Sequence, residues 1–484
     1  MDRESAKPLH RQLYDAFRSM IIARGFQSGQ QVPSSRALAI ELGISRIPVL
    51  TAYGQLLAEG YFESRAGSGT YVSSSLPDAL TSCEPPCAEK EEPRSTVRRL
   101  SGRSSLPPSR ESVPWVFGSG AFSVGHVALD HFPFQVWSEL IARHGRKVRA
   151  SAMNYGDSMG SMSFRETIAA YLRTSRAVQC DAREIMVVNG SQQALDLCAR
   201  VLLDPGDAVW VEEPGYEMTR VALSLAGCRL IPVPVDGEGM DVAAGIRLSR
   251  NARVACVTPS HQMPLGVTMS ASRRIQLLEW ADSSGSWIVE DDYDSEYRYE
   301  SMPIASLQGM DRSARVIYIG TFSKTLLPSL RLGYMVIPPD LVDRFVAVRR
   351  ALDFCPPHLN QAVVSDFISQ GHYARHIRKT RLLYRERRSV LAEALRNEFG
   401  AQLQILGGEA GMHFVVTLPP EWSDERISAD AAAQRLWLWP LSPSYLGREK
   451  RQGLILGFGS TTAADIPSAV DRLAGVLRHT VRAS

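Results

Sequence analysis

A proline-rich stretch in the first quarter of the chain most constrains how this sequence can fold. Seven prolines fall within residues 76–114, among many serines, mixed charges and few large apolar side chains. Such a segment cannot bury enough apolar surface to form a core, and its prolines favour an extended, semi-rigid path. Because 484 residues are too many for one compact core, we expect folded units at 1–75 and 115–484, joined by a linker at 76–114.

The first unit begins with the apolar spacing of two helices. Apolar residues recur on one helical face over residues 8–24, where Met20 is among the side chains expected to point inward. After two glycines, Ser34 is placed to cap a second, short helix that stops at Gly43.

A third helix is expected to begin after Ser45, which can cap it, and to end before Gly60. By their spacing, its inward residues are predicted to be Val49, Leu50, Tyr53, Leu56 and Leu57. The sequence YFESRAGSGTYV that follows has the pattern of two short strands around a glycine-rich turn. Two helices across a tight turn, followed by such a hairpin, predict a winged helix-turn-helix of α+β class.

The span from Gly25 to Val72 resembles the winged-helix domain of the GntR superfamily. The resemblance is carried by a second helix that starts SSR, a turn at LG, a third helix that opens with SR, and the sequences YxxLxxEGY and GSGTYV. It implies a double-stranded DNA operator as partner, because the start of a recognition helix reaches base edges while the preceding helix faces the phosphates. The candidate DNA-contacting residues are Ser35, Arg36, Ser45, Arg46, Gly67 and Ser68.

Two arginines are the main candidates for DNA contact. Arg46 is the candidate base reader and Arg36 the candidate backbone or base contact, because arginine donates two hydrogen bonds to guanine or phosphate. The alternative is that both are merely solvated helix ends. Residues 1–75 hold eight Lys and Arg against six Asp and Glu, so non-specific attraction is weak and dimerisation is needed for useful affinity. Pro48 replaces the hydroxyl residue usual in relatives, which puts one phosphate contact in doubt.

Beyond Trp115 the pattern changes to buried apolar strands followed by helices. The strand-like runs are EIMVV, DAVWVEE, ARVACV, SWIVEDD and ARVIYIG. Their alternation with helical segments predicts an α/β unit with a mostly parallel central sheet. Ligands of such folds bind at the carboxyl ends of the strands.

Residues 116–484 resemble fold-type I aminotransferases, and their pairing with a GntR-like head resembles the MocR-type regulators. The motifs that carry this resemblance are TFSKTLLPSLRLGY, IVEDDYDSEY and TPSHQMPLG. It implies pyridoxal 5'-phosphate as cofactor, with Lys324 forming the Schiff base, Asp291 holding the pyridine nitrogen and Tyr293 donating to the ring's 3-oxygen. From its residues alone, the acidic cluster around Asp291 fits a metal site or a solvated loop equally well.

The resemblance assigns the rest of the cofactor site as well. Four residues are expected to contact the phosphate. Ser191 and Gln192 lie at a helix start, Thr321 supplies a hydroxyl, and Arg331 supplies the positive charge. Tyr216 matches the aromatic residue that stacks on the ring, and its alternative is a plain core tyrosine. His261 and Gln262 are expected beside the ring, and Tyr155 is expected to reach the phosphate of a neighbouring subunit in a homodimer.

The resemblance leaves open whether the chain turns over amino acids. Aminotransferases hold the substrate carboxylate with an arginine in a C-terminal strand, where this chain has Ile455 in GLILGFG and Arg451 just before it. We therefore expect a DNA-binding transcription regulator that senses pyridoxal 5'-phosphate, an amino acid or an amine. The alternatives are an active aminotransferase with an accessory DNA-binding head, and a DNA binder with a vestigial cofactor pocket.

Composition excludes several other classes. The seven cysteines are scattered and lack zinc-site spacing, so we expect no metal and a reducing compartment. The charged first residues do not fit a signal peptide, and the uncharged stretch at 112–129 contains a proline and three glycines that spoil a lipid-facing helix. A cytoplasmic location without membrane contact is expected.

Overall fold

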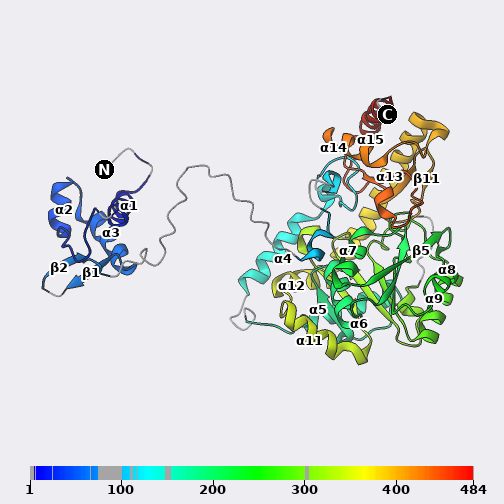
Figure 1. The fold of residues 1–484 in the computed structure, drawn as a ribbon, viewed down its shortest axis with the longest axis horizontal. Coiled ribbons are helices and arrows are strands. Elements are labelled where there is room, and N and C mark those ends of the chain that lie inside the picture. The colour runs from blue at the N-terminus through cyan, green and yellow to red at the C-terminus, as the bar shows by residue number, and fades with distance from the viewer. Residues whose placement is uncertain are drawn as a thin grey trace. The chain divides into compact units, whose positions relative to one another are not determined.

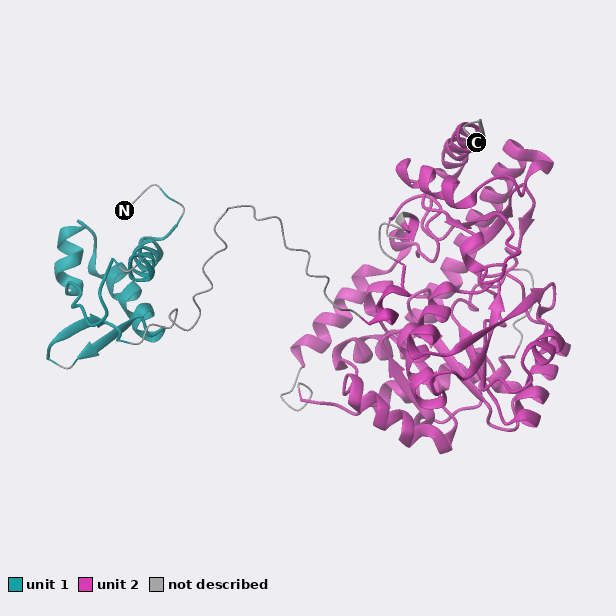
Figure 2. Cartoon of the chain, in the orientation of Figure 1, with its two compact units in different colours: residues 1–99 teal, residues 100–484 magenta. Residues whose placement is uncertain are grey.

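The computed structural model describes residues 5, 7–23, 25–65, 67–74, 101–108, 113–116, 118–147, 154–299 and 305–482. The chain divides into two compact units, residues 1–99 and 100–484, each of which is described by itself (Figures 1 and 2). Most of the predicted linker at 76–114 lies outside the described residues.

The first unit contains the predicted three helices and hairpin (Figure 1). Its elements are α1 (Leu9–Ile22), α2 (Ser35–Glu41), α3 (Arg46–Ala58), β1 (Phe62–Arg65) and β2 (Gly69–Val72). The Ser34 side chain accepts a hydrogen bond from the Ala37 amide and caps α2 as expected. The two strands pair antiparallel, and Gly67 in their turn has a φ of +74°, a conformation that favours glycine.

One apolar core joins the helices of this unit to its hairpin. Tyr53 of α3 lies at its centre, with its ring 5.5 Å from Phe17 of α1 and 5.2 Å from Phe62 of β1. The burial predicted for Met20 and Leu50 is wrong, because Met20 is 43% exposed and Leu50 is 47% exposed. Each lies at the edge of its helix's apolar stripe, where spacing alone does not decide burial.

The second unit follows the predicted alternation of strands and helices. Its strands are β3 (Ile185–Val188), β4 (Ala208–Glu213), β5 (Arg229–Asp236), β6 (Gly239–Met240), β7 (Val254–Val257), β8 (Trp287–Asp292), β9 (Val316–Thr321), β10 (Gly333–Val336), β11 (Ile405–Leu406), β12 (His413–Thr417), β13 (Trp439–Pro440) and β14 (Gly453–Gly457). Its helices are α4 (Phe134–Arg146), α5 (Met162–Ser175), α6 (Ser191–Leu202), α7 (Glu217–Ala226), α8 (Val242–Leu248), α9 (Ala271–Ser284), α10 (Leu307–Met310), α11 (Val342–Leu352), α12 (His358–Ser369), α13 (His372–Phe399), α14 (Asp424–Ala433) and α15 (Ile466–Arg482).

The central sheet has eight strands in the order β3-β10-β9-β8-β7-β4-β5-β6. The pairs from β9 through β8, β7 and β4 to β5 are parallel, which confirms the mostly parallel sheet. β10 runs antiparallel to both of its neighbours, and β6 runs antiparallel to β5. The carboxyl ends of β7, β8 and β9 therefore meet at one edge of the sheet.

Helices cover both faces of this sheet, because its strand residues alternate between two buried sides. Met186 and Val188 of β3 pack in a core with α6, α7 and α11. Ile185 and Val187 point to the opposite core, which includes α5, α12 and α13. Farther along the sheet, α8 and α9 cover that second face. The strands are thus buried on both sides, as expected for a parallel sheet.

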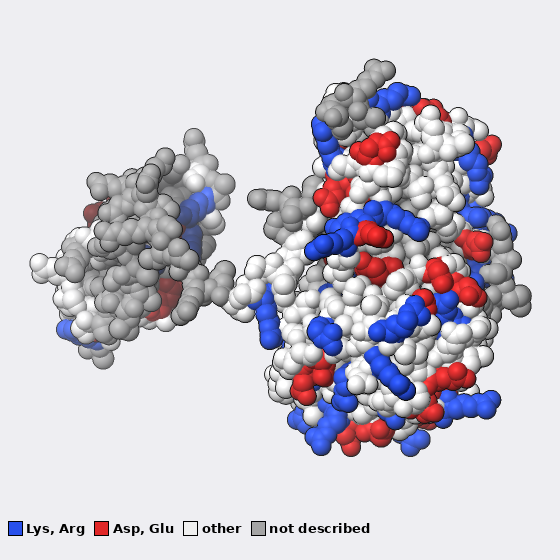
Figure 3. Space-filling model, turned by 45° about the vertical axis from the view of Figure 1, so that its right-hand side comes forward, with Lys and Arg blue, Asp and Glu red and all other residues white. Residues whose placement is uncertain are grey.

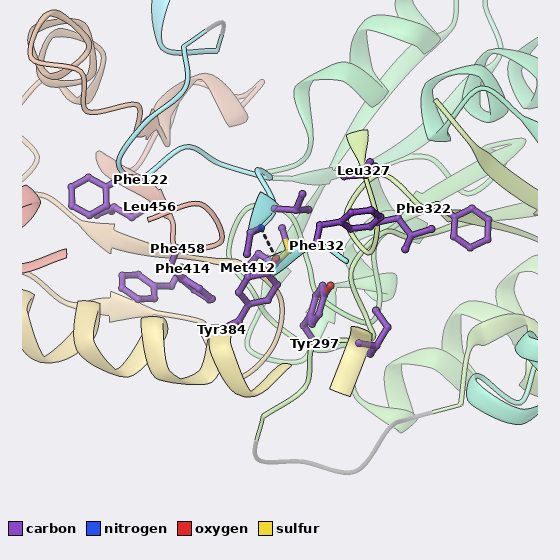
Figure 4. Close-up of a cluster of buried hydrophobic side chains, with 14 of the residues drawn as sticks. Phe122, Phe132, Tyr297, Phe322, Leu327, Tyr384, Met412, Phe414, Leu456 and Phe458 are labelled. Atoms are coloured by element: carbon purple, nitrogen blue, oxygen red, sulfur yellow. Dashed lines mark hydrogen bonds between the residues drawn. The ribbon is translucent and has the colours of Figure 1, made fainter. Parts of the chain in front are cut away.

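A second sheet near the C-terminus has the order β11-β12-β14-β13, and all of its pairs are antiparallel. Its residues share one large buried cluster with the segment that follows β9 (Figure 4). In that cluster, Phe414 of β12 and Leu456 of β14 belong with Phe322 and Leu327, which flank Lys324 in the sequence. The two sheets therefore share a core next to that lysine.

The surface of the second unit carries both signs of charge. On the face shown in Figure 3, basic and acidic side chains are interspersed, without one large field of either sign. Across the described part of the chain, every helix is either too short or too polar to cross a bilayer.

Candidate functional site

A cavity of about 320 Å³ opens at the carboxyl edge of the central sheet. Thr258 follows β7, Asp291 lies near the end of β8, Thr321 ends β9, and Ser191 begins α6 after β3. The cavity brings together eight of the predicted cofactor-binding residues: Ser191, Gln192, Tyr216, Asp291, Tyr293, Thr321, Lys324 and Arg331. Residues scattered over more than a hundred positions of sequence thus line one space at the position expected for this fold.

Lys324 is half-buried and projects into this cavity from the turn after β9. Its Nζ atom donates a hydrogen bond of 3.1 Å to the carbonyl oxygen of Gly125. Glycine favours this approach, because Gly125 has a φ of +74° and a Cβ there would lie 2.3 Å from Nζ, so the lysine end would have to move. Burial lowers the pKa of the Lys324 amine, an effect that the charges of Asp294 and Asp291 oppose. The amine is therefore closer to the neutral, nucleophilic form than a surface lysine.

Asp291 supplies a buried carboxyl group to the cavity. Burial raises its pKa to about 7, against a hydrogen bond with Ser191 that acts in the opposite direction. Its Oδ1 atom is buried and has no hydrogen-bond partner among the described residues. A buried acceptor of this kind is costly unless a donor reaches it. The group thus fits a protonated ring nitrogen of a bound cofactor.

The side of the cavity next to α6 suits an anion. Ser191 starts this helix, whose free backbone amides and dipole favour negative charge. Arg331 lies beside it, with Nη2 donating 2.8 Å to the carbonyl oxygen of Asn189. The hydroxyl of Ser323 is buried without a partner among the described residues, and Thr321 lines the same cavity. Hydroxyls, helix amides and one guanidinium make a phosphate-binding set.

Two tyrosines, Tyr216 and Tyr293, also line the cavity. Burial raises the pKa of Tyr216 to about 12, so its phenol stays neutral. The Tyr293 hydroxyl donates 2.9 Å to the carbonyl oxygen of His261 and lies 3.2 Å from the Nδ1 atom of that residue. Tyr293 is therefore held in place by the segment that contains His261.

His261 does not line the cavity and instead lies behind it. Its Nδ1 atom is 3.1 Å from both carboxylate oxygens of Asp294, and both side chains are almost fully buried. Because a carboxylate accepts hydrogen bonds, Nδ1 is the protonated nitrogen of the ring. Asp294 also lines the cavity beside Tyr293, although no sequence motif pointed to it.

His413 lies beside this histidine–aspartate pair. The two histidine rings are 4.7 Å apart, and the His413 Nε2 atom is 3.1 Å from the carbonyl oxygen of Pro264. Burial and the neighbouring His261 hold the pKa of His413 well below its usual value, so its ring is neutral. His261, Asp294 and His413 each have one atom of a kind that can bind a metal ion, and these three atoms lie within 4.8 Å of one another. This grouping was not expected from the sequence. The observed contacts, however, are hydrogen bonds within the protein.

Two further predicted residues do not enter the cavity. Gln262 is buried and donates to the Glu212 carboxylate at 3.1 Å and to the Pro214 carbonyl at 2.8 Å, so it stabilises the fold behind the site. Tyr155 is 79% exposed, with its ring 5.2 Å from that of Phe354. Tyr155 therefore does not line the cavity of its own chain, and its contact with the phosphate of a neighbouring subunit stays a prediction.

The side of the cavity formed with the second sheet was not foreseen. It includes Val124, Met412 and Trp439, which are apolar and come from distant parts of the chain. Ile455 of β14 is 1% exposed and packs beneath this wall in an apolar cluster with Val124. The side chain at this position, where aminotransferases have the carboxylate-binding arginine, is thus part of an apolar cluster.

The predicted DNA-contacting residues lie at two helix starts and in the hairpin turn. The Nε atom of Arg46, at the start of α3, donates 3.1 Å to the Ser35 hydroxyl at the start of α2. Arg36 is exposed one residue later in α2. Ser45 occupies the N-cap position of α3, but its side chain makes no capping hydrogen bond, contrary to the expectation. Gly67 and Ser68 form the exposed tip of the hairpin.

The fold and the cavity together define a protein with two parts: a winged-helix DNA-binding unit and a unit of aminotransferase fold. Residues 9–72 match the family described as bacterial regulatory proteins, gntR family, and residues 121–447 match aminotransferase class I and II. Over 476 residues the chain is 40% identical to the probable rhizopine catabolism regulatory protein MocR of Rhizobium meliloti, with coverage of 98% of this chain and 94% of the relative. The chain belongs to the MocR-type transcription regulators.

Solved aminotransferases share the fold of the second unit. The kynurenine aminotransferase of Pyrococcus horikoshii, solved in complex with PMP, has a TM-score of 0.72 and 30% identity, over 79% of this chain and 97% of that chain. LysN, the alpha-aminoadipate aminotransferase of Thermus thermophilus complexed with N-(5'-phosphopyridoxyl)-L-leucine, has a TM-score of 0.72 and 27% identity, over 80% and 98%. The second unit thus has a fold that holds pyridoxyl groups in other proteins.

Proposed function

We propose that this transcription regulator binds pyridoxal 5'-phosphate in the cavity around Lys324 and thereby senses a small molecule, which is the cofactor itself, an amino acid or an amine. The observation that carries the proposal is the pairing of two groups in one cavity. The Lys324 amine has a lowered pKa, and the buried Asp291 carboxyl has an oxygen without a partner among the described residues. The unpartnered oxygen would be costly without a ligand that uses it, and a lysine with a lowered pKa in a cavity is typical of a functional site.

The residues of the cavity fit the parts of that cofactor. Arg331, Ser191 and Thr321 would hold the phosphate, and Asp291 would accept a hydrogen bond from the protonated pyridine nitrogen. Tyr216 would pack against the ring, while Tyr293 is held by His261 in reach of the cavity. When bound, the cofactor supplies an electrophilic carbon that amines attack and a ring that withdraws electrons.

The proposal includes a route from the cavity to DNA. A ligand that binds one arrangement of the second unit more tightly than another shifts the balance between them, and this bias passes to the DNA-binding units. A homodimer would supply the paired heads that a weakly basic winged helix needs for useful affinity. Its operator would be double-stranded DNA contacted through Arg36 and Arg46, and action on chromosomal DNA would place the protein in the bacterial cytoplasm.

The decisive experiment measures cofactor and DNA binding in one preparation of the full-length protein. Lys324→Ala should remove the visible absorbance of bound pyridoxal 5'-phosphate and the ligand response of a mobility shift, while basal DNA binding remains. Lys379→Ala, at an exposed position of α13, is the matched control and should behave as wild type. Equal ligand responses in wild type and Lys324→Ala would contradict the proposal.

A working aminotransferase is the second candidate, favoured by the 30% identity to a kynurenine aminotransferase. The two functions differ in turnover. Release of keto acid in large excess over protein, with an amino acid and a keto-acid acceptor both present, would favour the enzyme. At most one equivalent of product per subunit would favour the sensor.

A further inference from the structure

The cavity has two chemically different sides, and the difference indicates which ligand enters it. We propose that the effector is a primary amine with an apolar body and without a carboxylate next to its amine, rather than an α-amino acid. The inference rests on the proposed cofactor site, because the amine is taken to reach Lys324 beside the bound cofactor.

The side of the cavity near the second sheet is apolar. Val124 and Met263 belong to a buried apolar cluster against which Trp439 packs, and all three line the cavity. Ile455 lies directly opposite Trp439 in the pairing of β13 with β14. Behind the lining there is therefore more apolar packing, with Ile455 only 1% exposed. A ligand body placed here gains from burying apolar surface and meets no partner for a charge.

The charges that line the cavity also oppose a carboxylate at this side. Among the described lining residues, the cations are Lys324 and Arg331, and Arg331 is hydrogen-bonded at the α6 side. His413 is a neutral ring because burial and His261 lower its pKa. Asp294 presents a carboxylate that His261 holds in place. Apart from Lys324 itself, a ligand carboxylate at this side would therefore meet no lining cation among the described residues and would face the Asp294 carboxylate, which would instead attract a ligand ammonium.

The hydroxyl groups of the cavity do not change this balance. The Thr258 hydroxyl is committed to the Glu212 carboxylate, to which it donates at 2.6 Å. The Tyr293 hydroxyl is committed to the carbonyl oxygen of His261. Recognition of the effector is therefore expected to come from one ammonium contact near Asp294 and Lys324 and from apolar contact beyond it.

The test compares each amine with the amino acid that differs from it only by the carboxylate, such as 2-phenylethylamine with phenylalanine and isobutylamine with valine. Full-length protein loaded with pyridoxal 5'-phosphate is titrated, and the dissociation constant is read from the cofactor absorbance and from calorimetry. The amine of each pair should bind at least about tenfold more tightly. Equal or tighter binding of the amino acids, or no binding of either class at millimolar concentration to loaded protein, would overturn the inference.

A single substitution should reverse the preference. Trp439→Arg places a cation on the apolar wall at a half-buried position, and it should move the amino-acid to amine affinity ratio by about tenfold or more toward the amino acid. Trp439→Leu keeps the wall apolar and should retain the preference for the amine. Cofactor absorbance is recorded for the wild type and for each variant before titration. A wild type that binds no cofactor would refute the proposed site, whereas an unchanged preference in a loaded Trp439→Arg variant would refute the inference.

Discussion

Replacing Asp291 by Asn should change how the stability of the second unit depends on pH. Folding raises the pKa of this carboxyl from 3.8 to about 7, so the folded unit holds the proton more tightly than the unfolded chain does. The free energy of unfolding therefore falls as the pH rises between these two values. At about 1.36 kcal/mol per pKa unit, linkage gives a loss of about 2–3 kcal/mol from this group between pH 5 and pH 8, and Asp291→Asn should remove that contribution.

The assay is denaturant unfolding of cofactor-free protein followed by tryptophan fluorescence. All eight tryptophans lie between residues 115 and 439, so the signal reports the second unit alone. Asp282→Asn, at an exposed position of α9, is the control and should leave the pH dependence of wild type unchanged. If the curves of Asp291→Asn and wild type stay parallel from pH 5 to pH 8, Asp291 is not the buried acid described above. With cofactor added, the variant should bind it more weakly.

Three other substitutions test the remaining parts of the chain. Arg46→Ala should weaken specific operator binding by about 1–3 kcal/mol in a mobility shift, whereas Arg11→Ala on α1 should have little effect, and equal losses would contradict a base contact. Asp294→Asn removes a negative charge that favours a protonated nitrogen at position 324, so the absorbance titration of the loaded protein should move to lower pH, and an unmoved midpoint would argue against their proximity. Gly125→Ala, which places a side chain at a φ of +74° and a Cβ 2.3 Å from the lysine Nζ, should weaken cofactor loading, and normal loading would show that the lysine and the loop accommodate the change.

The sequence was most informative where local rules decide the structure. The resemblance to fold-type I aminotransferases assigned Lys324, Asp291 and Arg331 to one site, and the strands and helix starts that converge at one edge of the sheet bring them into one cavity. The cap at Ser34 and the hairpin turn at Gly67 follow from the chemistry of the residues themselves. These features depend on a few neighbouring residues and on the order of elements.

Tertiary packing decides which other residues are buried and which line the cavity, and the pattern of a single segment does not predict this packing. Leu50 was expected inside and is exposed, while Ala52 of the same helix is fully buried, because the partner helix and hairpin select the edge of the stripe. Asp294 was not among the predicted site residues, because the family motif assigned a cofactor contact to the adjacent Tyr293 and none to Asp294. His413 and Trp439 come from the second sheet, and no local motif connects them to Lys324.

The construction of the cavity from both sheets explains how a small ligand can act at a distance. Ser191, Asp291 and Thr321 belong to the first sheet and its helices, while Met412 and Trp439 belong to the second sheet or its edge. A ligand that touches both groups binds best at one spacing of the two sheets, which is the differential affinity that a population shift requires. Binding should therefore slow amide hydrogen exchange in β12 and β14 together with the segment after β8. Protection confined to the first sheet would mean that the ligand does not bridge the two, and the signal to DNA would need another origin.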